Sequence, residues 1–125
     1  MYTLLEKIKI RLEQFHMESI MDEDGNSKNI LVFDNVEDNP IIEQLIQEAW
    51  DDIRSYRQYP SSYSDEKIEN DLNKYEGIVI KLVVYDFNKI GIDGQSEDAE
   101  NGNTRSYVKR ESILANVYPL VTVLF

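Results

Sequence analysis

The segment Ile-Val-Ile-Lys-Leu-Val-Val-Tyr at residues 78–85 would carry apolar side chains on almost every side of a helix. Such a helix has to be covered over most of its surface, so we expect it to be the central element of a small helical bundle. The helical pattern begins after Ser64, which suits an N-cap followed by two acidic residues. Gly77 costs about 1 kcal/mol relative to Ala inside a helix, and predicts a division into helices over 65–75 and 77–89.

A second helix is predicted just as clearly. Asn39 suits an N-cap, and Pro40 suits the first helical position, where its missing N–H costs nothing. Apolar residues recur at helical spacing to about Gln58, and Pro60 then stops the helix. Trp50 is the only tryptophan, and we expect it to anchor the core; the alternative is an exposed role at an interface.

The first helix is expected over about residues 3–15. Thr3 and Glu6 have the spacing of a capping box, in which each side chain satisfies a free backbone N–H. The following segment, 17–38, is polar and turn-rich, with a short apolar run at 29–33. That run could form a small hairpin with residues 19–21, or the segment could be a packed loop; a surface excursion without a role is the simplest interpretation.

The chain changes character after Ile90. Residues 91–103 have the composition of a long exposed loop, and 104–108 alternate like a strand. Ser112 is predicted to cap a final short helix over 113–117, which Pro119 ends. The last six residues, 120–125, are apolar and β-prone, so we expect them to dock on a partner or on the chain's own helices.

Length and composition indicate one domain over residues 1–125, with a helical core over about 1–90 and a loop and extended arm over 91–125. The chain has no cysteine, which excludes disulfides and suits a reducing compartment. We find no secretory signal and no apolar run of about 20 residues, so we expect no membrane association. The net charge of −11 disfavours tight binding to nucleic acid. It suits either simple solubility or a surface past which DNA slides.

No catalytic or metal-binding constellation stands out. His16 is the only histidine, at the expected end of the first helix, and a nucleophile–base pair or a histidine metal site needs more than one such group. An EF-hand-like spacing from Asp86 to Glu97 lacks a side-chain oxygen at Ile90, where a ligand is required. No glycine-rich phosphate loop is present. We therefore predict no enzyme activity, no cofactor and no metal.

Several segments, taken in order, resemble one family. They are Tyr-Asp-Phe-Asn-Lys-Ile-Gly-Ile-Asp-Gly-Gln-Ser-Glu at 85–97, Glu-Asn-Gly-Asn-Thr-Arg-Ser-Tyr at 100–107 and Val-Tyr-Pro-Leu-Val-Thr-Val-Leu at 117–124, together with the helix predicted over 40–59. This order is similar to that of phage head-tail connector (adaptor) proteins, which stand between portal and tail in long-tailed phages. The 17–38 segment departs from that pattern, because many members have a short turn there.

The resemblance implies a structural protein of the virion, assembled in the host cytoplasm. It implies a mainly α domain whose copies form a ring, usually of twelve, under the portal protein. The ring would extend the DNA channel without binding DNA specifically, and would dock the next connector, the stopper or head-closure protein. The resemblance also implies residues that contact the portal, and the candidates are Arg105, Tyr107, Tyr118, Leu120, Val121, Val123, Leu124 and Phe125.

For contacts between subunits we consider Gly91, Gly94 and Ser96, although this loop could be a simple connection. The main competing function is a small acidic protein that binds a host protein by mimicking the charge of DNA. Such a mimic should spread carboxylates regularly over an exposed face and needs no apolar tail. The apolar run at 120–125 therefore favours the adaptor.

Overall fold

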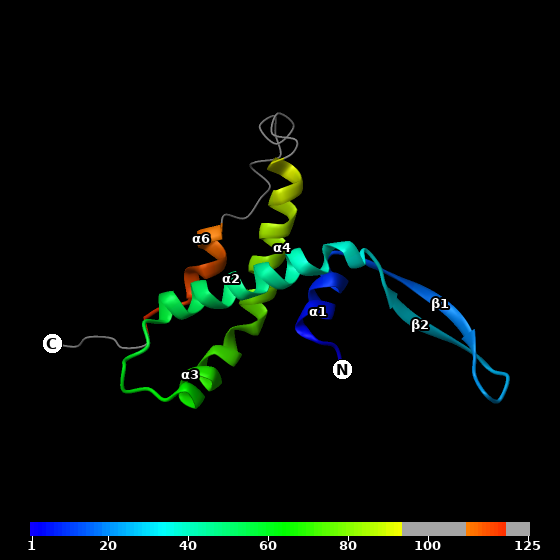
Figure 1. The fold of residues 1–125 in the computed structure, drawn as a ribbon, viewed down its shortest axis with the longest axis horizontal. Helices are drawn as coiled ribbons and strands as arrows, with labels where there is room; N and C mark the ends of the chain where they lie inside the picture. The colour runs from blue at the N-terminus through cyan, green and yellow to red at the C-terminus, as the bar shows by residue number, and fades with distance from the viewer. Residues whose placement is uncertain (94–109, 120–125) are drawn as a thin grey trace.

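Helices α2 (Asn39–Arg57) and α4 (Glu76–Asp93) cross at the centre of the computed structural model, which describes residues 1–93 and 110–119 (Figure 1). The elements that surround this pair are α1 (Leu4–Arg11), α3 (Asp65–Leu72), α6 (Arg110–Ile113) and the short 3-10 turns Val36–Asp38, Asn73–Tyr75 and Leu114–Asn116. Strands β1 (Phe15–Met21) and β2 (Ser27–Phe33) form a hairpin that extends away from the helices (Figure 1). The expected mainly α fold with four to five helices is confirmed.

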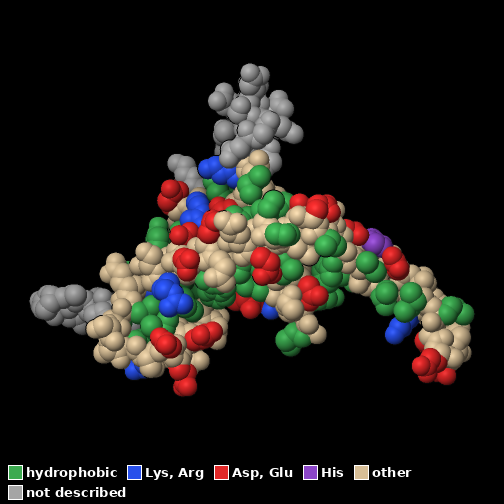
Figure 2. Space-filling view, in the orientation of Figure 1, with side chains coloured by type: hydrophobic (Ala, Val, Ile, Leu, Met, Phe, Trp, Pro, Cys, Tyr) green, Lys and Arg blue, Asp and Glu red, His purple; other side chains and the backbone are tan. Residues whose placement is uncertain are grey.

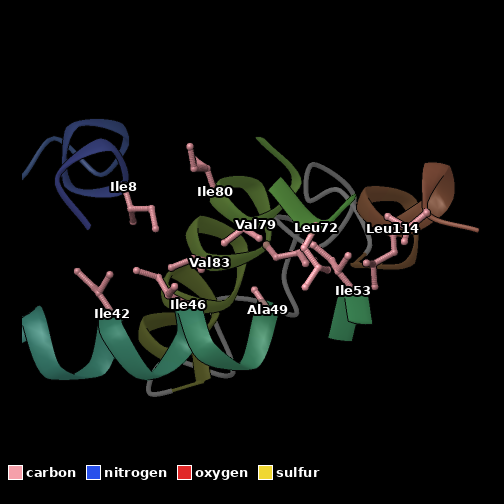
Figure 3. Packing of buried hydrophobic residues seen from close by; sticks show 12 residues of the cluster. Ile8, Ile42, Ile46, Ala49, Ile53, Leu72, Val79, Ile80, Val83 and Leu114 are labelled. Carbon is pink, nitrogen blue, oxygen red and sulfur yellow. The ribbon is translucent and has the colours of Figure 1, made fainter. Parts of the chain in front are cut away.

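The core lies where the apolar faces of α2 and α4 meet. Residues 78–85 of α4 thus have the central position that was expected for them. Each element contributes side chains that are almost completely buried (Figure 3). They are Ile42, Ile46, Ala49 and Ile53 from α2, Val79, Ile80, Leu82 and Val83 from α4, and Ile8, Leu72, Leu114 and Val117 from the surrounding segments. Trp50 is half-buried and packs against this cluster from outside, so it covers the core but does not form its centre.

Two of the predicted caps are confirmed. The Thr3 hydroxyl accepts the Glu6 backbone N–H at 3.2 Å, and the Glu6 carboxylate accepts the Thr3 N–H at 2.9 Å. Ser64 Oγ accepts the Lys67 N–H at 3.2 Å and starts α3. Both motifs satisfy backbone donors that a helix N-terminus leaves free.

The first helix is shorter than predicted. It ends at Arg11, because the backbone of Glu13 turns left-handed, with φ +60°, and the strand β1 follows. Phe15 and His16 therefore belong to the hairpin and not to a helix. The hairpin pairs Phe15 with Phe33 at its base and Met21 with Ser27 at its tip. Because the two strands are each seven residues long, this part of the 17–38 segment is a hairpin and not a packed loop.

Three further boundaries differ from the prediction. The Asn39 side chain does not cap α2, because its Oδ1 accepts the Lys9 ammonium at 2.6 Å instead. The break before α4 falls at residues 73–75, so Gly77 lies in the first turn of α4. That helix continues through Gly91 to Asp93 and does not give way to a loop at residue 91.

The C-terminal helix begins earlier than predicted. α6 starts at Arg110, so Ser112 lies within it and caps nothing, while the chain becomes extended at Val117, before Pro119. The predicted strand over 104–108, most of the predicted loop and the tail over 120–125 lie outside the described residues. In the part of the chain that is described, no helix is long and apolar enough to cross a membrane.

Candidate assembly site

The segment 110–119 is attached to the helical body through Arg110. Its guanidinium donates to Asp86 of α4 at 3.0 and 3.1 Å and to Asp52 of α2 at 2.6 Å. The hydrogen bonds that Arg110 donates to Asp86 raise the pKa of Arg110 above its usual value, although partial burial opposes this. One side chain thus joins α6 to both central helices, and planar two-point contact with a carboxylate fixes its orientation.

A second attachment lies at the end of α2. Arg57 is only 7% exposed, and it donates to both oxygens of Asp71 in α3 at 2.8 and 3.0 Å. Its remaining nitrogen, Nη1, donates to the backbone carbonyl of Tyr118 at 3.0 Å. Tyr59 donates its hydroxyl to the same Asp71 carboxylate. Arg57 therefore ties α2, α3 and the C-terminal segment together at one point.

Arg57, Tyr59 and Lys74 surround the Asp71 carboxylate and stabilise its ionised form. Burial alone would raise the pKa of Asp71, but hydrogen bonds from Arg57, Tyr59 and Lys74 outweigh it and lower the pKa to about 2. Burial and the hydrogen bond to Asp71 raise the pKa of Tyr59 to about 12. The carboxylate is thus ionised and the phenol neutral across the physiological pH range.

Together the two attachments determine where the chain leaves the body. Leu114 and Val117 are buried in the core, while Arg110 and Arg57 hold the segment on either side of them. Tyr118 stays 59% exposed although Arg57 binds its backbone carbonyl. The body therefore presents an exposed aromatic side chain at a fixed position, immediately before the apolar run at 120–125.

Of the residues that the sequence put forward, the structure places two. Tyr118 is exposed at the end of the described segment, and Gly91 lies within α4. The remaining candidates lie outside the described residues: Arg105, Tyr107, Leu120, Val121, Val123, Leu124, Phe125, Gly94 and Ser96.

Arg57, Asp71 and Arg110 are not among the residues that the sequence put forward. A signal for Arg57 was present, because it lies four positions after Ile53, in register with the apolar stripe of α2. A charged residue at a buried position of an amphipathic helix requires a partner of opposite charge. The partners themselves, Asp71 and Tyr118, are 14 and 61 positions away, and only the fold brings them together.

The described residues hold no cluster of His, Asp and Glu that could bind a metal ion. The EF-hand-like spacing fails for a structural reason, because Asp86 lies in the middle of α4 and its carboxylate already accepts Arg110. His16 is exposed on the hairpin, where its ring nitrogens contact Asp34 and Glu18 at 2.7 Å, and the hydrogen bonds to Glu18 and Asp34 raise its pKa. Over the visible face, carboxylates are mixed with basic and apolar side chains and form no regular array (Figure 2).

Comparison with known proteins gives one match. The family model described as phage gp6-like head-tail connector protein matches residues 26–118, which is about three quarters of the chain. No curated protein and no solved structure matches it. The matched region runs from the tip of the hairpin through the central helices to Tyr118, and so includes both arginine attachments.

Proposed function

Because the chain belongs to the family of phage gp6-like head-tail connector proteins, we propose that it is the adaptor bound to the portal of a tailed phage. Copies of the chain would form a ring, which we expect to be a dodecamer, directly below the portal protein. The ring would extend the DNA channel and offer a platform for the stopper or head-closure protein. The chain would join the virion after folding in the host cytoplasm, and would have a structural and not an enzymatic role.

The observation that carries this proposal is the family match, and the double attachment of the segment 110–119 supports the portal contact. A terminal segment whose base is already fixed loses less conformational freedom when it binds a partner. Here Arg110 and Arg57 provide that base, and the apolar, β-prone run at 120–125 has the composition of a strand that adds to a sheet or fills a groove. We therefore infer that residues 118–125 reach the portal.

The acidity of the chain supports the channel role. Binding of proteins to DNA draws most of its affinity from cations that replace the counterions of the phosphates. With 24 Asp and Glu against 13 Lys and Arg, each subunit carries a net charge of −11, so a ring of these subunits would let DNA pass without holding it. The mixed surface of Figure 2 gives no independent support to a mimic of DNA charge.

The test is co-purification with the portal protein of the same phage. The full chain should co-purify with portal, whereas a variant lacking residues 119–125 should lose most of the association and keep its helical content, because the core and both arginine attachments remain. Tyr118→Ala should weaken the association to an intermediate degree, since Arg57 binds the backbone carbonyl and not the ring. Absence of association between the full chain and portal would overturn the proposal. Unfolding of the truncated variant would instead assign the tail to the core.

A further inference from the structure

The hairpin arm, residues 15–33, is a part of this chain that the family match covers only in part. The match begins at Asn26, so the whole of β1 lies outside it. The arm extends from the body as a two-stranded ribbon (Figure 1). An isolated hairpin of this kind is marginally stable in water, and gains stability when one of its faces packs against something else.

The arm is held firmly at its base. Its two connections to the body, at Glu13 and Asn35, both adopt left-handed backbone conformations, with φ +60° and +53°. Lys9, which is almost completely buried, donates to the carbonyl of Asn35 at 3.1 Å. The Gln14 amide donates to Asp38 at 3.0 Å, and Asp34 N–H donates to the Gln14 carbonyl at 2.9 Å. These contacts fix the direction of the arm, so little entropy is lost when it binds.

The arm carries apolar side chains that the body does not cover. The strand register places Met17, Met21 and Leu31 on one face, which they share with Ser19, Ser27 and Asn29, and the two methionines are 55% and 69% exposed. Beyond them the turn contains three carboxylates in succession, at residues 22–24 (Figure 2). Within the described residues none of these carboxylates forms an ion pair. The arm therefore offers two exposed methionines beside an acidic tip.

The outward face of α4 has the complementary character. Lys81, Tyr85 and Asn88 recur along the side of the helix opposite the buried residues Val79 and Val83, with Lys89 beside them. Lys81 and Lys89 are exposed and form no ion pair with any described residue, in a chain that is otherwise strongly acidic. The two carboxylates of α4 within 76–90 are paired with other residues, Glu76 with Lys7 and Asp86 with Arg110, and not with these lysines.

We propose that the hairpin arm of one copy docks on this outward face of α4 in the neighbouring copy, with the acidic tip beside Lys81 and Lys89. The inference rests on the proposed ring. A ring requires two different, complementary surfaces on each subunit, one that reaches forward and one that receives. The charge of the tip and of the α4 face makes these two surfaces complementary to each other. The arm points away from its own α4, so the contact joins different copies (Figure 1).

Engineered cysteines test the contact directly, because the chain has none of its own. The variant with Met21→Cys and Asn88→Cys keeps every charge of the proposed contact. It is assembled with the portal protein of the same phage, treated with a short bismaleimide and separated on a denaturing gel. We expect a ladder of dimers, trimers and larger species, because each copy carries both halves of the contact. A mixture of the two single-cysteine variants should give dimers only.

The matched control replaces Asn88→Cys by Asn70→Cys, on the exposed side of α3. It should give no ladder. If rings form but the Asn88 variant crosslinks no better than the Asn70 control, the docking surface is wrong while the adaptor function stands. If the full chain assembles neither alone nor with portal, the adaptor function itself fails, and this inference fails with it.

Charge reversal gives a second, independent readout. Lys81→Glu should raise the concentration needed for half-assembly by about tenfold or more, because like charges placed face to face at an interface are strongly unfavourable. Glu23→Lys in the same chain should restore most of the loss. Lys67→Glu on α3, a control for the change in net charge, should have a much smaller effect. Equal effects of Lys81→Glu and Lys67→Glu, or failure of Glu23→Lys to rescue, would overturn the proposed pairing.

Discussion

Arg57 shows how a single residue can hold three segments at once. It is buried at the end of α2, and its guanidinium binds Asp71 in α3 and the carbonyl of Tyr118. A buried ion pair of this kind is costly to break, because the remaining charge stays in a poorly solvated position. The stability of the attachment should therefore depend on Asp71 far more than on the exposed charges around it.

Asp71→Ala should lower the free energy of unfolding by about 3–5 kcal/mol, since it leaves Arg57 buried without its carboxylate. Urea unfolding followed by the fluorescence of Trp50 measures the change. Lys74→Ala is the control, because Lys74 contacts the same carboxylate at 2.9 Å from a largely exposed position. It should cost at most about 1 kcal/mol. Equal losses in the two variants would show that burial of Arg57 is not the reason.

The same carboxylate makes a prediction about pH. The pKa of Asp71 is about 2 in the folded chain against an ordinary value of 3.8, so the folded state binds its proton less readily than the unfolded state. The stabilisation, about 2 kcal/mol, is complete above pH 4–5 and disappears as the pH falls towards 2. Comparison of urea unfolding of the wild type and Asp71→Ala over this range should show the difference between them shrinking with acid. A constant difference would contradict the assignment.

At the scale of elements, helix ends depend on short local motifs, which is why several of them could be predicted. The Thr3–Glu6 capping box and the Ser64 cap are both present where the sequence indicates them. The cap predicted at Asn39 is absent because the Asn39 side chain accepts a hydrogen bond from Lys9, 30 positions away. A local pattern cannot reveal such a competing partner.

Ser64→Ala should destabilise the protein by about 1 kcal/mol, because α3 loses the acceptor for its Lys67 N–H. Ser62→Ala, two positions earlier in the connecting segment and also exposed, should change stability by less than about 0.5 kcal/mol. Thermal unfolding followed by circular dichroism distinguishes the two. An equal effect at both positions would mean that the cap contributes nothing specific.

The hairpin could be predicted from the sequence only in part. The apolar run at 29–33 indicated a strand, but a packed loop fitted the same residues equally well. Strand β1 was hidden because Phe15 continues the apolar spacing of α1, and only the left-handed turn at Glu13 ends that helix. Non-glycine residues adopt this conformation rarely, so no residue type at this position indicates it.

At the scale of the whole molecule, the two arginine attachments connect the scaffold of α2 and α4 to the C-terminal segment. Arg110→Leu removes the contacts with Asp52 and Asp86 and leaves both carboxylates without their partner. We expect faster hydrogen exchange at the Val117 amide, while amides in the middle of α2 and α4 keep their protection. Glu111→Ala, at the exposed neighbouring position, should leave exchange unchanged. Loss of protection throughout the chain would instead make Arg110 part of the global core.

Cryo-electron microscopy of the connector in the intact phage can show whether this chain forms a ring next to the portal. We expect a ring of copies of this chain immediately below the portal, with α2 and α4 forming each subunit and the segment after Tyr118 directed towards the portal. A connector without this chain, or the chain at another position in the particle, would contradict this expectation.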